Sequence, residues 1–297
     1  MHVVNNFATR FALVAAIIGG VNLPTLATAQ TDEAIEATRH VNIAGRQRML
    51  SQRISLAACL YRSGSNDVRY REMLSGAYSL FSASHNALIN GDTEMGLSPE
   101  EIPSVLAIMG QVNERFDALS PLVSAVLDGD EGSAEMMIRL DASGLEFLTI
   151  MNKAVNRIAS DYGEALEDLP LIHSITIDVA GRQRMLSQKS AKEFCLIDSG
   201  VDVVGNRENL LGTTTIFTNT LNALIHGFPG LVMPPPDAAV LAKLQEVEAA
   251  WLVPSSVLMR VANGGEITDT DRRIISGQIE NVLVLMNQAV GMYELGN

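Results

Sequence analysis

Two copies of one basic octapeptide hold the residues best suited to chemistry in this chain. Gly45-Arg-Gln-Arg-Met-Leu-Ser-Gln52 recurs 136 residues later as Gly181-Arg-Gln-Arg-Met-Leu-Ser-Gln188. Together with the residue that follows each copy, the octapeptides hold six of the 21 lysines and arginines, in a chain with 34 acidic residues. An arginine presents five N–H donors in a planar fork that fits carboxylates and oxyanions. The pattern predicts either an anion site or ion pairs with acidic residues of neighbouring helices, and the sequence leaves both open.

The octapeptides are part of a repeat that covers most of the chain. Other pairs match at an offset of 135 or 136 residues: Cys59 with Cys195, Ser63-Gly64 with Ser199-Gly200, Asn86-Ala-Leu-Ile with Asn222-Ala-Leu-Ile, and Met151-Asn with Met286-Asn. Matches spread over a whole unit at a near-constant offset indicate a tandem duplication. We therefore expect two domains, residues 30–166 and 167–297, after a leader at residues 1–29.

Turn-forming residues divide each repeat into four long segments. The breaks fall at residues 63–67, 90–99, 128–132, 198–200, 227–236 and 263–265. Between them, apolar residues recur at helical spacing. Thr31 and Asp32 are candidate caps of the first helix, and Asp168, followed by Pro170, is the candidate cap of its counterpart. Short connections favour antiparallel neighbours, so we predict an all-α protein of two tandem up-down four-helix bundles.

The opening helix of each repeat has two different faces when residues are placed at 100° intervals. One face is mostly apolar and should point into the bundle core: Ile43, Gln47, Leu50, Ile54, Ala57 and Tyr61. The other, which we call the polar stripe, consists of Gly45, Arg48, Gln52, Ser55 and Cys59 in the first copy and Gly181, Arg184, Gln188, Ala191 and Cys195 in the second. Small residues let another helix approach closely, and the arginine of each stripe needs an acceptor.

Each octapeptide, with the alanine before it, resembles the N-terminal sensor domain of type IV pilus methyl-accepting chemotaxis transducers, the PilJ-type domain. That domain is similar to the periplasmic sensor of the nitrate/nitrite histidine kinases. In those kinases the corresponding helix carries Gly-x-x-Arg-Met-x-Ser, and its arginine binds nitrate on the axis of a dimer. The pattern falls on Gly45, Arg48, Met49 and Ser51, and again on Gly181, Arg184, Met185 and Ser187.

The resemblance implies that the two repeats form an intramolecular pseudo-dimer that holds a small, nitrate- or nitrite-like anion between them. The candidate ligand-binding residues are Gly45, Arg48, Ser51, Gln52, Gly181, Arg184, Ser187 and Gln188. No kinase or methylation region follows the repeats, so we expect signalling to need a partner. The alternative function is an interaction module whose polar stripe docks a membrane receptor or a type IV pilus component.

The two cysteines bear on the pseudo-dimer. Cys59 and Cys195 each lie 11 residues beyond the arginine of their stripe, about three turns or ~16 Å along the helix. If the two opening helices pack in parallel around a pseudo-twofold axis, both cysteines face that axis at one height. They then form a disulfide, or they remain two buried thiols that act as small apolar side chains. The spacing is compatible with both.

Residues 1–29 have the pattern of a secretory signal peptide. Arg10 precedes an apolar stretch, and Ala27-Thr28-Ala29 has the small-x-small pattern of a cleavage site. An uncleaved membrane anchor is the alternative reading. No later segment reaches the ~20 apolar residues of a membrane span. We therefore expect a soluble, periplasmic mature chain.

Composition and motifs argue against several other functions. The net charge of −13 repels nucleic acid and anionic membranes, so neither is expected as a partner. The histidines show no i,i+4 pairing, and the cysteines are too far apart for a zinc knuckle. The sequence has no Gly-x-Ser-x-Gly elbow, phosphate loop or dinucleotide-binding fingerprint. We expect no enzyme activity, cofactor or metal.

Expression of the chain with its leader should yield a mature protein that begins at Gln30 in the periplasmic or secreted fraction, because cleavage is expected after Ala29. The intact mass of the purified protein measures this directly. A full-length mass, with the protein in the membrane pellet, would instead identify the apolar segment as an anchor.

Overall fold

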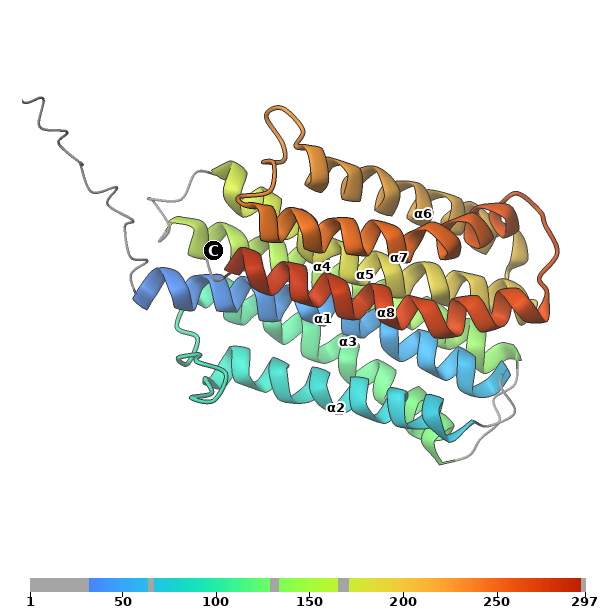
Figure 1. Ribbon diagram of the computed structural model, residues 1–297. Coiled ribbons are helices and arrows are strands. Elements are labelled where there is room, and N and C mark those ends of the chain that lie inside the picture. The colour runs from blue at the N-terminus through green and yellow to red at the C-terminus, as the bar shows by residue number, and fades with distance from the viewer. Residues whose placement is uncertain (1–31, 64–66, 129–133, 165–170, 295–297) are drawn as a thin grey trace, which may run out of the picture. The chain divides into compact units, whose positions relative to one another are not determined.

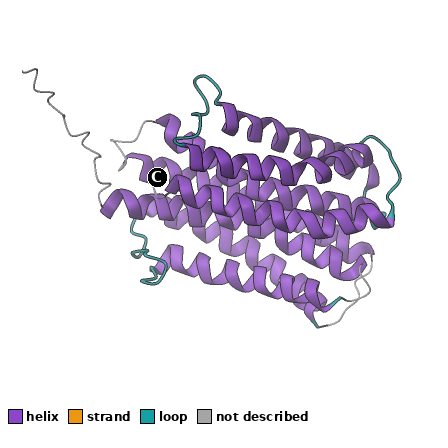
Figure 2. Cartoon of the chain, in the orientation of Figure 1, coloured by secondary structure: helices purple, strands orange, loops and turns teal. Residues whose placement is uncertain are grey.

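The computed structural model describes residues 32–63, 67–128, 134–164 and 171–294. Within them the chain forms eight long helices (Figures 1 and 2): α1 (Asp32–Ser63), α2 (Val68–Asn90), α3 (Pro103–Leu127), α4 (Ala134–Glu164), α5 (Leu171–Asp198), α6 (Val203–His226), α7 (Ala238–Ala262) and α8 (Asp269–Glu294). The described residues contain no β-strand beyond two isolated bridges, so the all-α prediction is confirmed. The predicted leader, the boundary after residue 166, and the candidate cap residues Thr31, Asp168 and Pro170 lie outside them.

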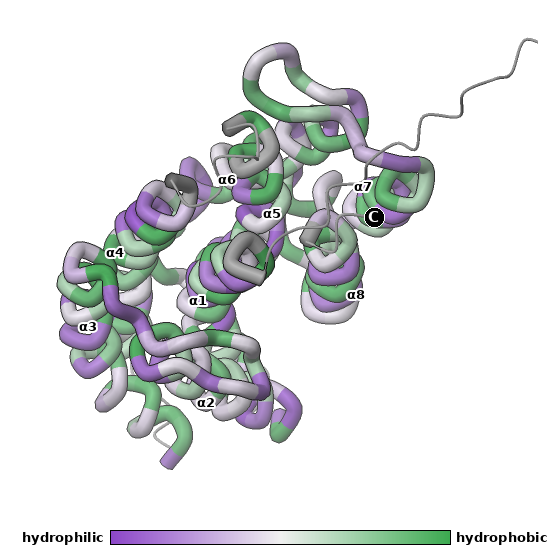
Figure 3. The backbone as a smooth tube through the Cα atoms, turned by 90° about the vertical axis from the view of Figure 1, so that its left-hand side faces the viewer, coloured by the Kyte–Doolittle hydropathy of each residue, from purple (hydrophilic) through white to green (hydrophobic). Residues whose placement is uncertain are grey.

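The helices form two four-helix bundles, as the sequence predicts. Helices α1 to α4 form the first bundle and α5 to α8 the second, and consecutive helices run up and down (Figure 1). Viewed along the helices, α1 and α5 lie at the centre, where the two bundles meet (Figure 3). Helix α1 packs against α2, α4 and α5, and α5 packs against α1, α6 and α8. The two opening helices are therefore covered on almost every side.

The duplication is visible in the connections between helices. Helices α2 and α6 end at Gly91 and Gly227, where φ is 77° and 76°. A Cβ at Gly91 would lie 2.7 Å from the backbone nitrogen of Pro99, so a side chain is excluded there by space as well as by the left-handed conformation. A short bridged turn follows each glycine, from Asp92 to Leu97 and from Phe228 to Val232. These two loops close the same end of their bundles.

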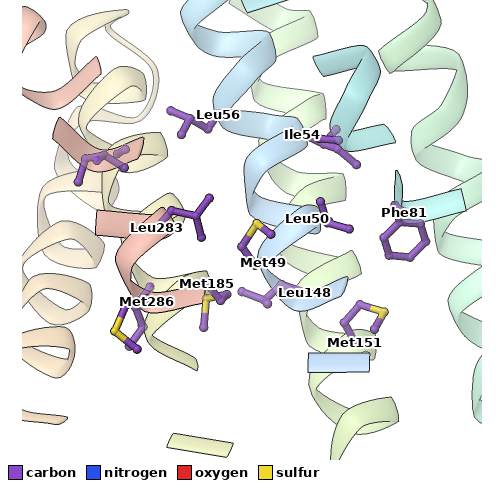
Figure 4. Close-up of a cluster of buried hydrophobic side chains, with 14 of the residues drawn as sticks. Met49, Leu50, Ile54, Leu56, Phe81, Leu148, Met151, Met185, Leu283 and Met286 are labelled. Atoms are coloured by element: carbon purple, nitrogen blue, oxygen red, sulfur yellow. The ribbon is translucent and has the colours of Figure 1, made fainter. Parts of the chain in front are cut away.

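The apolar core is continuous between the two repeats. Around the central helices, Met49 of α1, Leu148 of α4, Met185 of α5 and Met286 of α8 belong to one buried cluster (Figure 4). The first bundle adds stacked and edge-on rings at Phe81, Phe116 and Phe147, and the second adds Phe217 against Trp251. Phe116 and Trp251, which occupy matching positions in the two repeats, are both buried core residues.

A disulfide joins the two central helices at one end. Cys59 of α1 and Cys195 of α5 are bridged, with 6.2 Å between their Cα atoms. The spacing was compatible with a disulfide or with two buried thiols, and the structure contains the disulfide. The hydroxyls of Ser63 and Ser199 lie 3.0 Å apart one turn further on. Because both pairs have the same offset in sequence, α1 and α5 run parallel and in register.

None of the helices in the described part of the chain combines the length and apolarity that a membrane crossing requires.

Replacing both Cys59 and Cys195 with alanine should lower the free energy of unfolding by about 5 kcal/mol in the chain-entropy model, because the bridge closes a loop of 136 residues. Alanine keeps a small apolar side chain at each site, so the packing of α1 on α5 changes little. Urea unfolding of the variant, the oxidised wild type and the reduced wild type measures the effect. An unchanged midpoint on reduction would show that the bridge does not stabilise the fold.

Candidate functional site

The glycine, arginine and cysteine of each polar stripe face the other repeat across the α1–α5 contact. All five stripe residues of α1 are buried: Gly45, Arg48, Gln52, Ser55 and Cys59. The same holds for the stripe of α5. The stripe is therefore an interface inside the molecule. It cannot serve as the outer docking surface that the alternative function assigns to it, because the partner repeat already covers it.

The arginines of the two stripes converge on a pair of glycines. A Cβ built on Gly45 would lie 3.6 Å from Nη2 of both Arg48 and Arg184. A Cβ built on Gly181 would lie 3.9 Å and 3.5 Å from the same two atoms. The ends of both guanidinium groups thus share one small space between the helices. An added Cβ at either glycine would be in ordinary van der Waals contact with these nitrogens.

Each arginine reaches across to the opposite repeat. Nη2 of Arg48 donates to Oδ1 of Asp178 at 2.6 Å, and Nη2 of Arg184 donates to Oδ1 of Asn42 at 2.7 Å. Asn42 and Asp178 occupy equivalent positions in the two repeats, six residues before each arginine. The two contacts are therefore related by the pseudo-twofold axis. The acceptor is a neutral amide in one half and a carboxylate in the other.

Arg48 is buried to an unusual degree for a charged side chain. Its side chain is 1% exposed, and burial lowers the pKa of its guanidinium, while the charge of Asp178 acts in the opposite direction. Nε and Nη1 of Arg48 are buried and have no hydrogen-bond partner in the described part of the chain. A buried guanidinium with two unsatisfied donor nitrogens is costly, so this arginine has capacity for a further acceptor.

A small cavity lies between the two arginines. Its polar lining consists of Asn42, Arg48, Asp178 and Arg184, and its remaining walls include Gly45 and Gly181. The volume open to the centre of a water molecule is about 10 Å³, which is close to the minimum for one water. The site is thus a small, partly open space on the axis, with room for very little in this state.

The other candidate residues lie next to this cavity and do not line it. Ser51 and Ser187 donate to the backbone carbonyls of Arg48 and Arg184, at 2.8 Å and 2.9 Å. The amide of Gln52 points to α4, where Nε2 lies 3.5 Å from the carbonyl oxygen of Gly144. These residues brace the turns that carry the arginines. A direct ligand contact of the serines and glutamines stays a prediction.

Several basic residues of the repeated segment are in ion pairs. Arg53 makes two 2.7 Å bonds to Glu280 of α8 and also donates to Gln188. Lys189 pairs with the buried Glu193 on its own helix. Burial raises the pKa of Glu193, and the charges of two lysines counteract that effect. For these residues the ion-pair alternative is the one that the structure supports.

Sequence reasoning did not assign a role to Asn42 and Asp178. Both are part of the repeat, but nothing in the chain alone says that each faces the other repeat's arginine. These acceptors could have been found from the register of the two opening helices. If the helices run parallel with an offset of 136 residues, the residue about two turns before each arginine lies near the arginine of the opposite helix. Side chains that point along the helix can then meet.

Comparison with known proteins fits this geometry. The sequence profile of the type IV pili methyl-accepting chemotaxis transducer N-terminal family, PilJ, matches residues 30–135 and 174–273. The chain belongs to this family. Each PilJ stretch contains one octapeptide, so the tandem arrangement predicted from the repeats is confirmed. No curated protein matches the chain significantly. PilJ membership identifies the chain as a sensory-type module and does not assign a ligand to the site.

Removal of the Asp178 carboxylate should destabilise this PilJ pair more than removal of Arg48. Asp178→Ala leaves Arg48 buried without its counter-ion, which costs about 3–5 kcal/mol of unfolding free energy. Arg48→Met should cost less, because Asp178 is 20% exposed and keeps its 2.8 Å contact with Arg182. Urea unfolding of both variants gives the comparison.

Arg182→Ala is the matched control, because Arg182 is 47% exposed and its i,i+4 pair with Asp178 is worth only about 0.3–0.5 kcal/mol. The reverse order, with Arg48→Met the more damaging change, would mean that packing of the arginine stem outweighs the ion pair.

Proposed function

We propose that this chain is a periplasmic sensory module that binds a small oxyanion between α1 and α5, with Arg48 and Arg184 as its anchors. The observation that carries the proposal is the convergence of two guanidinium groups on one small space, with Nε and Nη1 of Arg48 lacking partners in the described part of the chain. A small oxyanion carries several acceptor oxygens around one central atom. It can therefore accept from both guanidinium groups at once, with charge-assisted hydrogen bonds.

The size of the cavity suggests how binding produces a signal. A cavity of about 10 Å³ is too small for nitrate or nitrite, so entry of either requires α1 and α5 to separate locally. The disulfide at Cys59 and Cys195 holds the helices together about three turns beyond the arginines. Separation is then largest toward the start of the helices. A ligand that favours the separated state shifts the population toward it.

The proposed location has three independent supports. The apolar segment and Ala27-Thr28-Ala29 have the features of an export signal. The chain is in the family of chemotaxis transducer N-terminal domains. A disulfide between the central helices suits an oxidising compartment outside the cytoplasm.

A second candidate function is docking to a receptor or pilus component, and one feature favours it. In the loop between α6 and α7, Phe228 and Leu231 are 53% and 54% exposed. The equivalent loop of the first repeat is polar at Thr93 and Glu94. Both loops are tied to the opening helix of their own repeat, by the Ser98 backbone to Glu36 and by the Met233 backbone to Thr176. An exposed apolar loop in only one repeat suits a contact that uses one side of the pseudo-dimer. Docking and anion binding are compatible.

The anion proposal is tested by thermal unfolding of the isolated protein. Nitrate or nitrite should raise the melting temperature more than chloride at equal ionic strength, because binding to the folded state stabilises it by about 2.7 kcal/mol at 100 times the Kd. Arg48→Ala and Arg184→Ala should each remove this rise. Arg115→Ala, on the exposed surface of α3, is the control and should keep it.

The result that would contradict the proposal is also specific. If no small oxyanion shifts the wild type while Arg48→Ala costs several kcal/mol of unfolding free energy, the arginines serve only as structural ion pairs.

A further inference from the structure

Eight of the nine residues that line the cavity belong to pairs related by the pseudo-twofold axis, and the ninth, Val290 of α8, has no counterpart in the lining. The four pairs are Val41 with Ile177, Asn42 with Asp178, Gly45 with Gly181, and Arg48 with Arg184. Three of these pairs conserve both charge and polarity. The pair Asn42 and Asp178 differs by one negative charge. The asymmetry therefore lies in the acceptor of each arginine and nowhere else among these pairs.

We infer that Asp178 is a built-in counter-anion that sets the charge of the ligand, so that the site takes monovalent oxyanions and rejects divalent ones. The inference rests on the proposed function and deepens it by naming the ligand class. Two guanidinium groups and one carboxylate line the cavity. A monovalent anion balances this lining. A divalent anion adds a second negative charge beside a carboxylate that is already present.

The position of Asp178 makes it a fixed part of the site. Its Oδ1 lies 2.6 Å from the buried Nη2 of Arg48, and its Oδ2 lies 2.8 Å from Nε of Arg182 on the same helix. The carboxylate is thus held by two cations, one inside the interface and one at its edge. It accepts from Nη2 of Arg48, while Nε and Nη1 have no hydrogen-bond partner in the described part of the chain. An incoming anion adds to Asp178 and does not replace it.

The strength of the effect follows from distance. A ligand charge about 5 Å from the Asp178 carboxylate is repelled enough, at an effective dielectric near 20, to weaken binding by roughly 100-fold. A dianion experiences both this repulsion and the attraction of the two arginines twice, but its desolvation cost grows with the square of its charge. The single net positive charge of the lining therefore offsets the desolvation of a monovalent anion better than that of a divalent one. Selectivity by charge therefore needs no change of shape.

The chain itself supplies the matched variants. Asn42 and Asp178 accept from equivalent arginine atoms at 2.7 Å and 2.6 Å, and asparagine and aspartate have nearly the same shape. Asp178→Asn removes one negative charge from the lining, and Asn42→Asp adds one. The double exchange Asn42→Asp/Asp178→Asn moves the carboxylate to the other half and keeps the wild-type charge.

The experiment is calorimetric titration of the full, oxidised chain and its three variants with nitrate and with sulfate at constant ionic strength. We expect the wild type to bind nitrate and not sulfate. Asp178→Asn should bind sulfate and should bind nitrate roughly 100-fold more tightly, and Asn42→Asp should lose nitrate binding by a similar factor. The double exchange should restore the wild-type preference. Circular dichroism and the intact disulfide establish that each variant is folded.

The outcomes separate the two proposals. If the wild type binds nitrate but Asp178→Asn and Asn42→Asp leave the preference between nitrate and sulfate unchanged, the charge-setting role is overturned and the anion site stands. If the wild type binds neither anion, the proposed function fails and the charge inference fails with it. If Asp178→Asn does not fold, Asn42→Asp and the double exchange still decide, since loss and recovery of nitrate binding depend on charge alone.

Discussion

Two cationic side chains buried at the contact between two parallel helices are the constraint on which the rest of the structure depends. A guanidinium is expensive to remove from water unless its donors are satisfied and its charge is balanced. Close approach of α1 and α5 is possible because glycine, serine and cysteine line the contact, and the arginines then need acceptors from the opposite helix. Asn42 and Asp178 each accept one such hydrogen bond from equivalent positions, and Asp178 also supplies a negative charge. The remaining helices enclose most of the pair with apolar residues.

The same contact makes one molecule of the two repeats. The disulfide and the serine pair fix the register at one end, and the crossed arginine contacts fix it at the other. Between them, Arg53 connects α1 to Glu280 of α8, so the second bundle is also held through its last helix. Polar groups that specify a single register, set within a continuous apolar core, give the interface one arrangement rather than many.

The sequence alone predicts most of this fold. The 136-residue offset and the helical spacing of apolar residues were enough to predict two four-helix bundles. The pseudo-dimer came from the family resemblance, and the equal spacing of Cys59 and Cys195 from the arginines was compatible with a parallel pairing of the opening helices. The acceptors of the arginines could not be predicted, because they depend on which residues face each other across the interface. Nor could the sequence tell that Gln52 turns to α4, since the helical wheel places it on the same stripe as Arg48. Sequence periodicity gives the direction of a side chain but not its partner.

Because the two repeats are joined in one chain, the total charge of the side chains on the pseudo-twofold axis can be odd. In a dimer of identical chains, every side chain on a twofold axis is present twice, so the sum of their charges is always even. A site built that way has to balance an odd charge with bound ions or by breaking its own symmetry. One chain that carries both halves has no such restriction, because a single substitution can fall in one half. Asp178 opposite Asn42 is a substitution of this kind. Duplication thus gave this interface access to odd charge states that a symmetric pair cannot encode.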